Sequence, residues 1–195
     1  MAEIQKIRNL LRSKILAQRD KLSAEGRRLK SELLVERLWE LAPFSRAEKI
    51  FTYINFRSEV ETIPLVRQCL KAGFIVAVPV TMRKESRLLA CRITDPDHDL
   101  HTGYCQIPEP DPATAPAVNP RDIEVILLPG SVFDRQVGRL GYGGGFYDRF
   151  LEYEAPQAVR IGLAFEMQIV ENLPLMPHDQ CLHYLVTEDR VLTFI

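Results

Sequence analysis

The chain has 195 residues, of which 46% are hydrophobic and 26% are charged. This length supports one well-filled core, and nothing in the composition indicates a second domain. A net charge of -1, from 25 basic and 26 acidic residues, gives no overall field to attract nucleic acid or an anionic membrane. No segment reaches the roughly 20 apolar residues of a membrane span, and charges interrupt the first residues too often for a signal peptide. We therefore expect a cytoplasmic protein with one domain over residues 1–195, binding neither nucleic acid nor membrane.

The cysteines and histidines offer no metal or redox motif. The four cysteines lie far apart, without a C-x-x-C pair, and are expected to be reduced and mostly in the core: Cys69, Cys91, Cys105 and Cys181. Residues 97–101 contain two Asp and two His, which could be drawn as a metal site. Because short His/Asp runs in proline-flanked polar loops are usually solvated, we do not expect one.

Two helices are expected at the start of the chain. Ala2 to about Arg19 carries apolar residues at helical spacing, and Arg8 and Arg12 share a neighbouring face. Charge pattern alone favours a solvated surface for these arginines. A second helix should begin after Ser23 as N-cap and run to about Leu41. We expect residues 2–41 to pack on an α/β core formed by residues 48–195.

A βαβ unit follows. Lys49 to Ile54 reads as a strand, Thr62 caps a helix with proline in its first turn, and Gly73 ends that helix before a strand over Phe74 to Val78. Such crossovers build parallel sheets, so the segment 55–61 after the first strand should lie at the carboxyl edge, where ligands bind. Phe56 and Glu61 are the candidates there. Without a ligand, the same pattern would make Phe56 a loop residue that covers the core and Glu61 an acid favoured by the dipole at a helix start.

The middle of the chain is rich in proline. Leu88 to Ile93 reads as a strand, and residues 95–120 then contain six prolines and are expected to be irregular. A loop this long in a compact domain is usually functional or mobile, and we interpret it as a flap or wall beside the substrate. Later elements are a strand over Val159 to Ala164, a short helix over Glu166 to Glu171, and a strand over Leu185 to Thr187.

The most informative stretch is LLPGSVFDRQVGRLGYGGGFYDRFL, residues 127–151. A buried strand over residues 125–128 leaves the sheet at Pro129-Gly130 and leads to a glycine cluster and a helix start. Consecutive N–H groups of a glycine-rich backbone, with the helix start, can surround a phosphate. Arg139 can fork onto phosphoryl oxygens, while Asp148 suits a divalent cation bridging them. The loop is not a Walker loop, because no Gly-Lys-Ser/Thr closes it, and it fits GxGxxG poorly.

These residues resemble the 5-formyltetrahydrofolate cyclo-ligases, also called 5,10-methenyltetrahydrofolate synthetases. LPGSVFD and GRLGYGGGFYDRFL are similar to the family, as are the basic first helix, the 59–62 segment, the strand ending Val78-Pro79, and the 177–179 segment. The resemblance covers nearly the whole chain. It implies a single three-layer α/β/α domain with a mainly parallel sheet, similar to the NagB/RpiA/CoA transferase fold, acting as a monomer.

The resemblance also implies the site. Arg139 and Asp148 would be catalytic, and Asp148 and Asp179 would contact Mg²⁺. The substrate 5-formyltetrahydrofolate would meet Phe56, Glu61, Tyr142 and Phe146. ATP would bind Arg8, Arg12, Arg139, Leu140, Gly141, Tyr142, Gly143, Gly144, Gly145, Phe146 and Tyr147. His183 departs from the family pattern, in which an acid is often found near that place.

The implied reaction is an ATP-driven cyclisation of 5-formyltetrahydrofolate to 5,10-methenyltetrahydrofolate, through a phosphorylated formyl group, with release of ADP and phosphate. An amide oxygen is a poor leaving group until it is phosphorylated, which explains the need for ATP. The protein then has to align two substrates and stabilise the transferring phosphoryl group. Two alternatives stay open: a related ATP-dependent small-molecule kinase or ligase, and a non-catalytic partner protein that binds folate or nucleotide.

Overall fold

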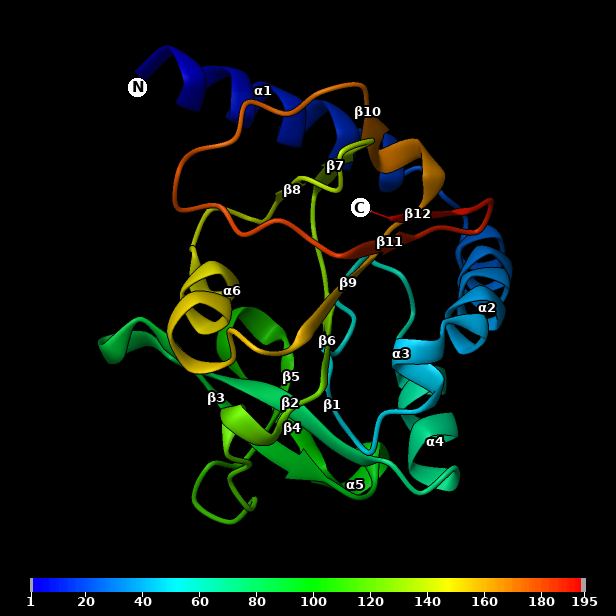
Figure 1. Cartoon of the computed structure of the whole chain (residues 1–195), viewed down its shortest axis with the longest axis vertical. Coiled ribbons are helices and arrows are strands. Elements are labelled where there is room, and N and C mark those ends of the chain that lie inside the picture. The colour runs from blue at the N-terminus through cyan, green and yellow to red at the C-terminus, as the bar shows by residue number, and fades with distance from the viewer. Residues whose placement is uncertain (1, 194–195) are drawn as a thin grey trace.

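The computed structural model describes residues 2–193 and is built on a seven-stranded sheet (Figure 1). Its strands, in spatial order, are β12 (Val191–Thr193), β11 (Tyr184–Val186), β9 (Val159–Leu163), β6 (Val125–Leu128), β1 (Lys49–Phe51), β2 (Ile75–Met82) and β3 (Arg87–Ile93). The five central strands are parallel, and the edge strands β12 and β3 are antiparallel to their neighbours. The expected mainly parallel sheet is therefore confirmed.

Helices cover both faces of this sheet. One face carries α2 (Ala24–Glu40), α3 (Ala42–Ser45) and α4 (Ile63–Lys71), and the other carries α6 (Phe146–Arg149), which continues as a π-helical turn, η4 (Phe150–Glu154). Two further helices lie outside these layers: α1 (Ala2–Arg19) packs against residues 132–134 and 166–168, and α5 (Pro96–Asp99) packs against α4. Side chains alternate between the two faces along a strand. Ile50 of β1 therefore packs in the core beneath α2 to α4, whereas Phe51 points to the opposite face and stacks on Phe150 of η4. The result is the expected three-layer α/β/α arrangement (Figure 1).

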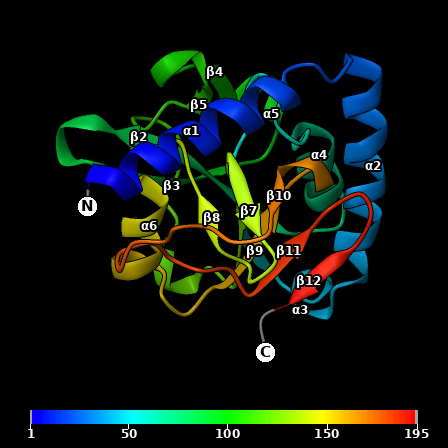
Figure 2. The same cartoon turned by 90° about the horizontal axis from the view of Figure 1, so that it is seen from above.

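The two expected N-terminal helices are present. Ser23 caps α2, with its hydroxyl accepting from the Gly26 N–H at 3.0 Å. Leu34 and Leu38 of α2 are fully buried against the sheet. Helix α1 crosses above the sheet, over β7 and β8, as the view from above shows (Figure 2). In residues 2–193, no helix combines the length and hydrophobicity needed to cross a membrane.

A second, three-stranded sheet lies between the main sheet and α1. It consists of β7 (Val132–Asp134), β8 (Arg139–Leu140) and β10 (Ile169–Val170), in the order β10-β7-β8. The sequence-based reading missed it, because it took the chain directly from Pro129-Gly130 to the glycines and assigned 166–171 to a helix. That segment is instead a 3₁₀ turn over Glu166–Gln168 followed by β10. The hairpin places Arg139 on a strand.

Residues 95–120 are more regular than expected. They contain α5 and a small antiparallel sheet of β4 (Leu100–Thr102) and β5 (Pro108–Pro110), with 3₁₀ turns over Tyr104–Gln106 and Pro120–Asp122. Proline is tolerated in β5 because a two-stranded ribbon leaves one side of each strand free of ladder hydrogen bonds. The remaining 3₁₀ turn, Arg83–Glu85, joins β2 to β3. Among the expected strands, β1 ends earlier than its apolar pattern indicated, at Phe51.

Candidate functional site

A cavity of about 510 Å³ opens at the carboxyl edge of the main sheet. Its walls come from the end of α1, the loop after β1, β2 and β3, the 104–109 segment, and the glycine loop with α6. The proline-rich segment contributes Tyr104, Cys105, Ile107 and Glu109 to these walls, and its contact with the substrate stays a prediction. A ligand in this cavity would therefore contact segments that are far apart in the sequence.

The glycine loop forms one side of the cavity. Gly143 and Gly145 have φ angles of +102° and +66°, which L side chains rarely adopt, and so require glycine. The loop is held from three directions. Arg12 Nε donates to the Gly141 carbonyl at 2.8 Å, Ser131 Oγ donates to the same oxygen at 3.2 Å, and Arg149 Nη2 donates to the Gly144 carbonyl at 3.0 Å.

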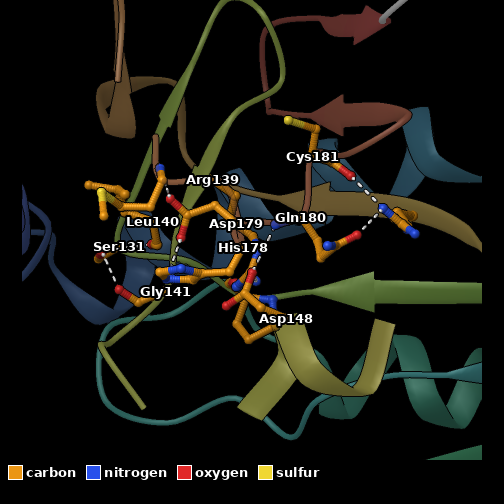
Figure 3. Close-up of polar contacts among 12 residues, drawn as sticks. Ser131, Arg139, Leu140, Gly141, Asp148, His178, Asp179, Gln180 and Cys181 are labelled. Carbon is orange, nitrogen blue, oxygen red and sulfur yellow. Dashed lines mark hydrogen bonds and ion pairs between the residues drawn. The ribbon is translucent and has the colours of Figure 1, made fainter. Parts of the chain in front are cut away.

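Arg139 and Asp148 form an ion pair across the base of this loop (Figure 3). Arg139 Nη2 donates to Asp148 Oδ1 at 2.8 Å, and Nη1 donates to the Pro129 carbonyl at 3.2 Å. The Arg139 side chain is 1% exposed, and its buried Nε has no hydrogen-bond partner among the described residues. The Gln180 N–H also donates to Asp148 Oδ1, at 3.2 Å. A buried arginine with an unused donor beside a glycine loop suits an incoming oxyanion.

A second ion pair joins α1 to the 174–180 loop. Arg8 Nη2 donates to Asp179 Oδ1 at 2.8 Å and Nη1 donates to Oδ2 at 2.5 Å, in a bidentate arrangement. The Met176 N–H also donates to Asp179 Oδ2. Burial by itself raises the pKa of Asp179, but the hydrogen bonds from Arg8 and Met176 lower it overall. Burial also lowers the pKa of Arg12, with a further contribution from the positive charge of Arg8.

The two predicted magnesium contacts differ in what they offer. Asp148 has one oxygen, Oδ1, engaged by protein donors, whereas both oxygens of Asp179 accept hydrogen bonds. Over residues 2–193, no three His, Cys, Asp or Glu side chains are grouped as a metal site. Mg²⁺ in phosphoryl-transfer sites needs only one or two carboxylates, with substrate phosphates and water completing its shell. Asp148 has the free oxygen that such a contact needs, and both magnesium contacts, Asp148 and Asp179, stay predictions.

An acid that sequence reasoning passed over lies in the cavity wall. Glu59, after β1, is 7% exposed. Its Oε2 accepts from the Phe56 N–H at 2.8 Å and its Oε1 from the Tyr142 hydroxyl at 2.5 Å. Burial raises the pKa of Glu59, although these hydrogen bonds and the charge of Arg19 oppose the shift. The only sequence signal for Glu59 was its place in the 59–62 segment.

Glu61, the acid chosen from the sequence, is placed elsewhere. It does not line the cavity, and its Oε1 accepts from Arg27 Nε of α2 at 3.1 Å. Of the other predicted residues, the cavity is lined by Phe56, Arg139, Gly141, Tyr142, Gly144, Gly145, Phe146, Tyr147 and Asp148. Arg8, Arg12, Leu140, Gly143 and Asp179 lie outside that lining. The structure thus brings together the glycine loop, Arg139, Asp148 and Phe56.

The departure at His183 has a structural explanation. Its Nδ1 accepts a hydrogen bond from the Arg160 backbone N–H at 2.9 Å, which joins β9 to the segment before β11. Burial, followed by the charge of Arg160, lowers the pKa of His183. The His183 ring therefore joins two neighbouring interior strands of the main sheet, and it does not line the cavity.

Comparison with known proteins identifies the family. The model of the 5-formyltetrahydrofolate cyclo-ligase family matches residues 4–188. The 5-formyltetrahydrofolate cyclo-ligase of Escherichia coli K12 is 29% identical over 178 residues, covering 91% of this chain and 98% of that protein. The Mus musculus 5-formyltetrahydrofolate cyclo-ligase is 26% identical over 187 residues, covering 92% of each chain.

Solved structures agree. The NMR structure of Aquifex aeolicus 5,10-methenyltetrahydrofolate synthetase superimposes with a TM-score of 0.85 at 32% identity, covering 96% of this chain and 93% of that one. A 5,10-methenyltetrahydrofolate synthetase from Mycoplasma pneumoniae has the same fold, with a TM-score of 0.74 at 22% identity, covering 93% of this chain and 98% of that one. With the glycine loop and its Arg139–Asp148 pair opening onto the cavity, these matches establish that the chain belongs to the 5-formyltetrahydrofolate cyclo-ligase family.

Proposed function

We propose that the protein converts 5-formyltetrahydrofolate to 5,10-methenyltetrahydrofolate with ATP and Mg²⁺ in the cavity at the carboxyl edge of the main sheet. Family membership supports the reaction and its use of ATP. The observation that carries the placement is the Arg139–Asp148 pair at the base of the glycine loop, where it faces the cavity.

The reaction requires activation of a poor leaving group. The formyl oxygen attacks the γ-phosphorus of ATP and ADP leaves, which gives a phosphorylated iminium on the folate. N10 then attacks the formyl carbon and loses its proton, and inorganic phosphate leaves with the former formyl oxygen. No side-chain nucleophile takes part, so the work of the protein is to align the two substrates and to stabilise charge on the moving phosphoryl group.

The residues around the glycine loop suit that work. Backbone N–H groups of the loop and the Arg139 guanidinium, which lines the cavity, would hold phosphoryl oxygens. Arg12, which donates to the Gly141 carbonyl, would add positive charge from α1, whereas the charge of Arg8 is paired with Asp179, so its contact with ATP stays a prediction. Asp148 would hold Mg²⁺ with its free oxygen, and the ion would neutralise charge on the phosphates when bound. Arg139 keeps that carboxylate in place.

The folate would occupy the apolar part of the cavity. Phe56 and Phe146 supply aromatic surface, and Glu59 is a buried carboxylate able to accept hydrogen bonds from the N–H groups of a pterin. We therefore assign to Glu59 the substrate contact that the family resemblance implied for Glu61. Glu59 retains lone pairs for a ligand, because a carboxylate accepts about four hydrogen bonds and two are used here.

The direct test mixes purified protein with 5-formyltetrahydrofolate, ATP and Mg²⁺ and follows the near-ultraviolet absorbance of the methenyl product. We expect product only when ATP is present, and strongly reduced product with Asp148→Ala. The Asp97→Ala variant is the matched control, since Asp97 also pairs with an arginine but at the exposed surface. ATP hydrolysis without methenyl product would favour a related kinase or ligase. Tight binding without turnover would favour a non-catalytic partner protein.

Two further expectations concern the oligomeric state and the localisation of the protein. We expect a monomer, which light scattering after size-exclusion chromatography would show as a mass close to the 22.3 kDa of one chain. We also expect the protein in the cytoplasm, which fractionation of the source cells would test.

A further inference from the structure

Arg19, the last residue of α1, is buried in the wall of the cavity. It is 3% exposed, and its guanidinium makes three hydrogen bonds. Nε donates to Ser58 Oγ at 3.0 Å, and Nη1 donates to the Tyr142 hydroxyl at 3.1 Å and to the Gly130 carbonyl at 3.3 Å. The helix dipole favours a cation in the last turn of α1. It explains neither the burial of this arginine nor its partners.

The partners of Arg19 belong to three separate parts of the site. Gly130 lies at the exit of β6, Ser58 precedes the folate-side acid Glu59, and Tyr142 lies in the glycine loop. The Tyr142 hydroxyl has one proton, which it donates to Glu59 Oε1 at 2.5 Å while accepting from Arg19. Arg19, Tyr142 and Glu59 therefore form a directed chain of hydrogen bonds from α1, through the phosphate loop, to the acid in the folate pocket.

Helix α1 donates hydrogen bonds to two adjacent residues of the glycine loop. Arg12 holds the Gly141 carbonyl and Arg19 holds the Tyr142 side chain. A phosphate that orders the loop backbone would therefore also fix the donor that orients Glu59. Conversely, a folate that fixes Glu59 would favour the loop arrangement that holds phosphate.

We propose that Arg19 and Tyr142 are positioning residues that couple the two substrate sites, so that ATP and folate each tighten the binding of the other. The inference rests on the proposed function of the cavity. Because coupling free energies are reciprocal, each substrate must raise the affinity for the other by the same factor.

The test uses Tyr142→Phe, which removes the hydroxyl of Tyr142 and keeps its aromatic ring. Calorimetry would measure the dissociation constant of β,γ-imido-ATP with Mg²⁺, with and without saturating 5-methyltetrahydrofolate, which lacks the formyl oxygen and cannot be phosphorylated. For the wild type we expect about tenfold tighter nucleotide binding with the folate present, within the usual range for coupled sites. For Tyr142→Phe the ratio should approach one. The exposed Tyr153 provides the control, and Tyr153→Phe should keep the wild-type ratio.

A second measurement separates positioning from simple loss of packing. Burial raises the pKa of Glu59, and the hydrogen bond from the Tyr142 hydroxyl lowers it. Tyr142→Phe should therefore raise the pKa of Glu59, so that folate affinity is lost at a higher pH on acidification. A purely structural defect would weaken folate binding equally at all pH values. Arg19→Lys keeps the positive charge but loses the planar guanidinium that donates to both Ser58 and Tyr142. It should reduce the coupling between nucleotide and folate binding and lower folate affinity most at acidic pH.

Two results would overturn the inference: no coupling in the wild type, or full coupling in Tyr142→Phe. Either can occur in a protein that forms methenyl product normally, and then only the inference fails. Absence of product from the wild type would instead contradict the proposed function itself.

Discussion

Arg139 Nη2 lies 2.8 Å from Asp148 Oδ1, and the nine-residue separation between them contains the whole glycine cluster that follows β8. The pair closes the loop at its base, because Arg139 is on a strand and Asp148 is on the helix that follows. A loop closed in this way presents its backbone to the cavity in one arrangement.

Arg139→Lys should lower kcat while leaving the fold intact. Lysine keeps the positive charge but has a single nitrogen in place of the two guanidinium nitrogens that donate to the Pro129 carbonyl and to Asp148. Loss of a preorganised donor to a developing oxyanion typically costs about 10²–10³ in kcat. Steady-state kinetics would show this loss, with Arg67→Lys as control at an exposed Arg–Asp pair. Equal activity of both variants would remove Arg139 from the mechanism.

Gly143→Ala should raise the KM for ATP. Gly143 has a φ of +102° and open space where the added methyl group would lie, so the cost is conformational strain of about 1–3 kcal/mol that displaces the loop. Gly73, at the end of α4, has a φ of +90° with equally open space and is not part of the glycine loop. Gly73→Ala should therefore lose similar thermal stability but keep the wild-type KM. An unchanged KM for ATP in Gly143→Ala would show that the loop conformation does not govern nucleotide binding.

Glu59→Gln should weaken folate binding, whereas Glu61→Gln should not. A hydrogen bond to a charged group contributes roughly 1.5–3 kcal/mol, which corresponds to an increase in folate KM of about tenfold to a hundredfold. Glu61 instead faces Arg27, so its variant should lose only a little stability. Because burial raises the pKa of Glu59, folate affinity in the wild type should fall as the pH is lowered through that raised value. If Glu61→Gln alone raised the folate KM, the assignment of Glu59 would be wrong.

Asp179→Asn should lower the stability of the fold. Breaking a buried ion pair typically costs about 3–5 kcal/mol, and the Arg8 and Asp179 side chains are 7% and 5% exposed. The pKa of Asp179 is lowered in the folded protein, so its stabilisation is present above the unfolded pKa of about 4 and is lost as the pH falls further. Denaturant unfolding should therefore show a lower free energy of unfolding for Asp179→Asn than for the wild type at pH 7. At pH 3 the gap between the two proteins should be smaller.

The same variant tests the magnesium contact. If Asp179 binds the ion, the Mg²⁺ concentration at half-maximal rate should rise as strongly in Asp179→Asn as in Asp148→Asn. If Asp179 serves only to hold Arg8, the magnesium midpoint should stay near that of the wild type.

Local patterns in the sequence predicted much of the fold. The unbroken apolar run of β6 and the caps at Ser23 and Gly73 depend on neighbouring residues and were identified correctly. The small sheet was missed because its strands are two or three residues long. Its strand β10 pairs with β7, whose residues lie about 36 positions away, as in the register of Ile169 with Phe133. Periodicity carries no signal over so few residues.

By itself, the sequence determined the parallel βαβ crossover and the glycine loop, because both are patterns of neighbouring residues, and it pointed to Arg139 and Asp148 as candidates, whose catalytic roles stay predictions. Only the tertiary structure decided that Glu59 rather than Glu61 faces the cavity, and that Arg8 pairs with Asp179 across 171 positions. The physical reason is that burial and ion pairing depend on which segments the sheet brings together. Two acids two residues apart look equivalent until one of them meets Arg27 and the other meets Tyr142.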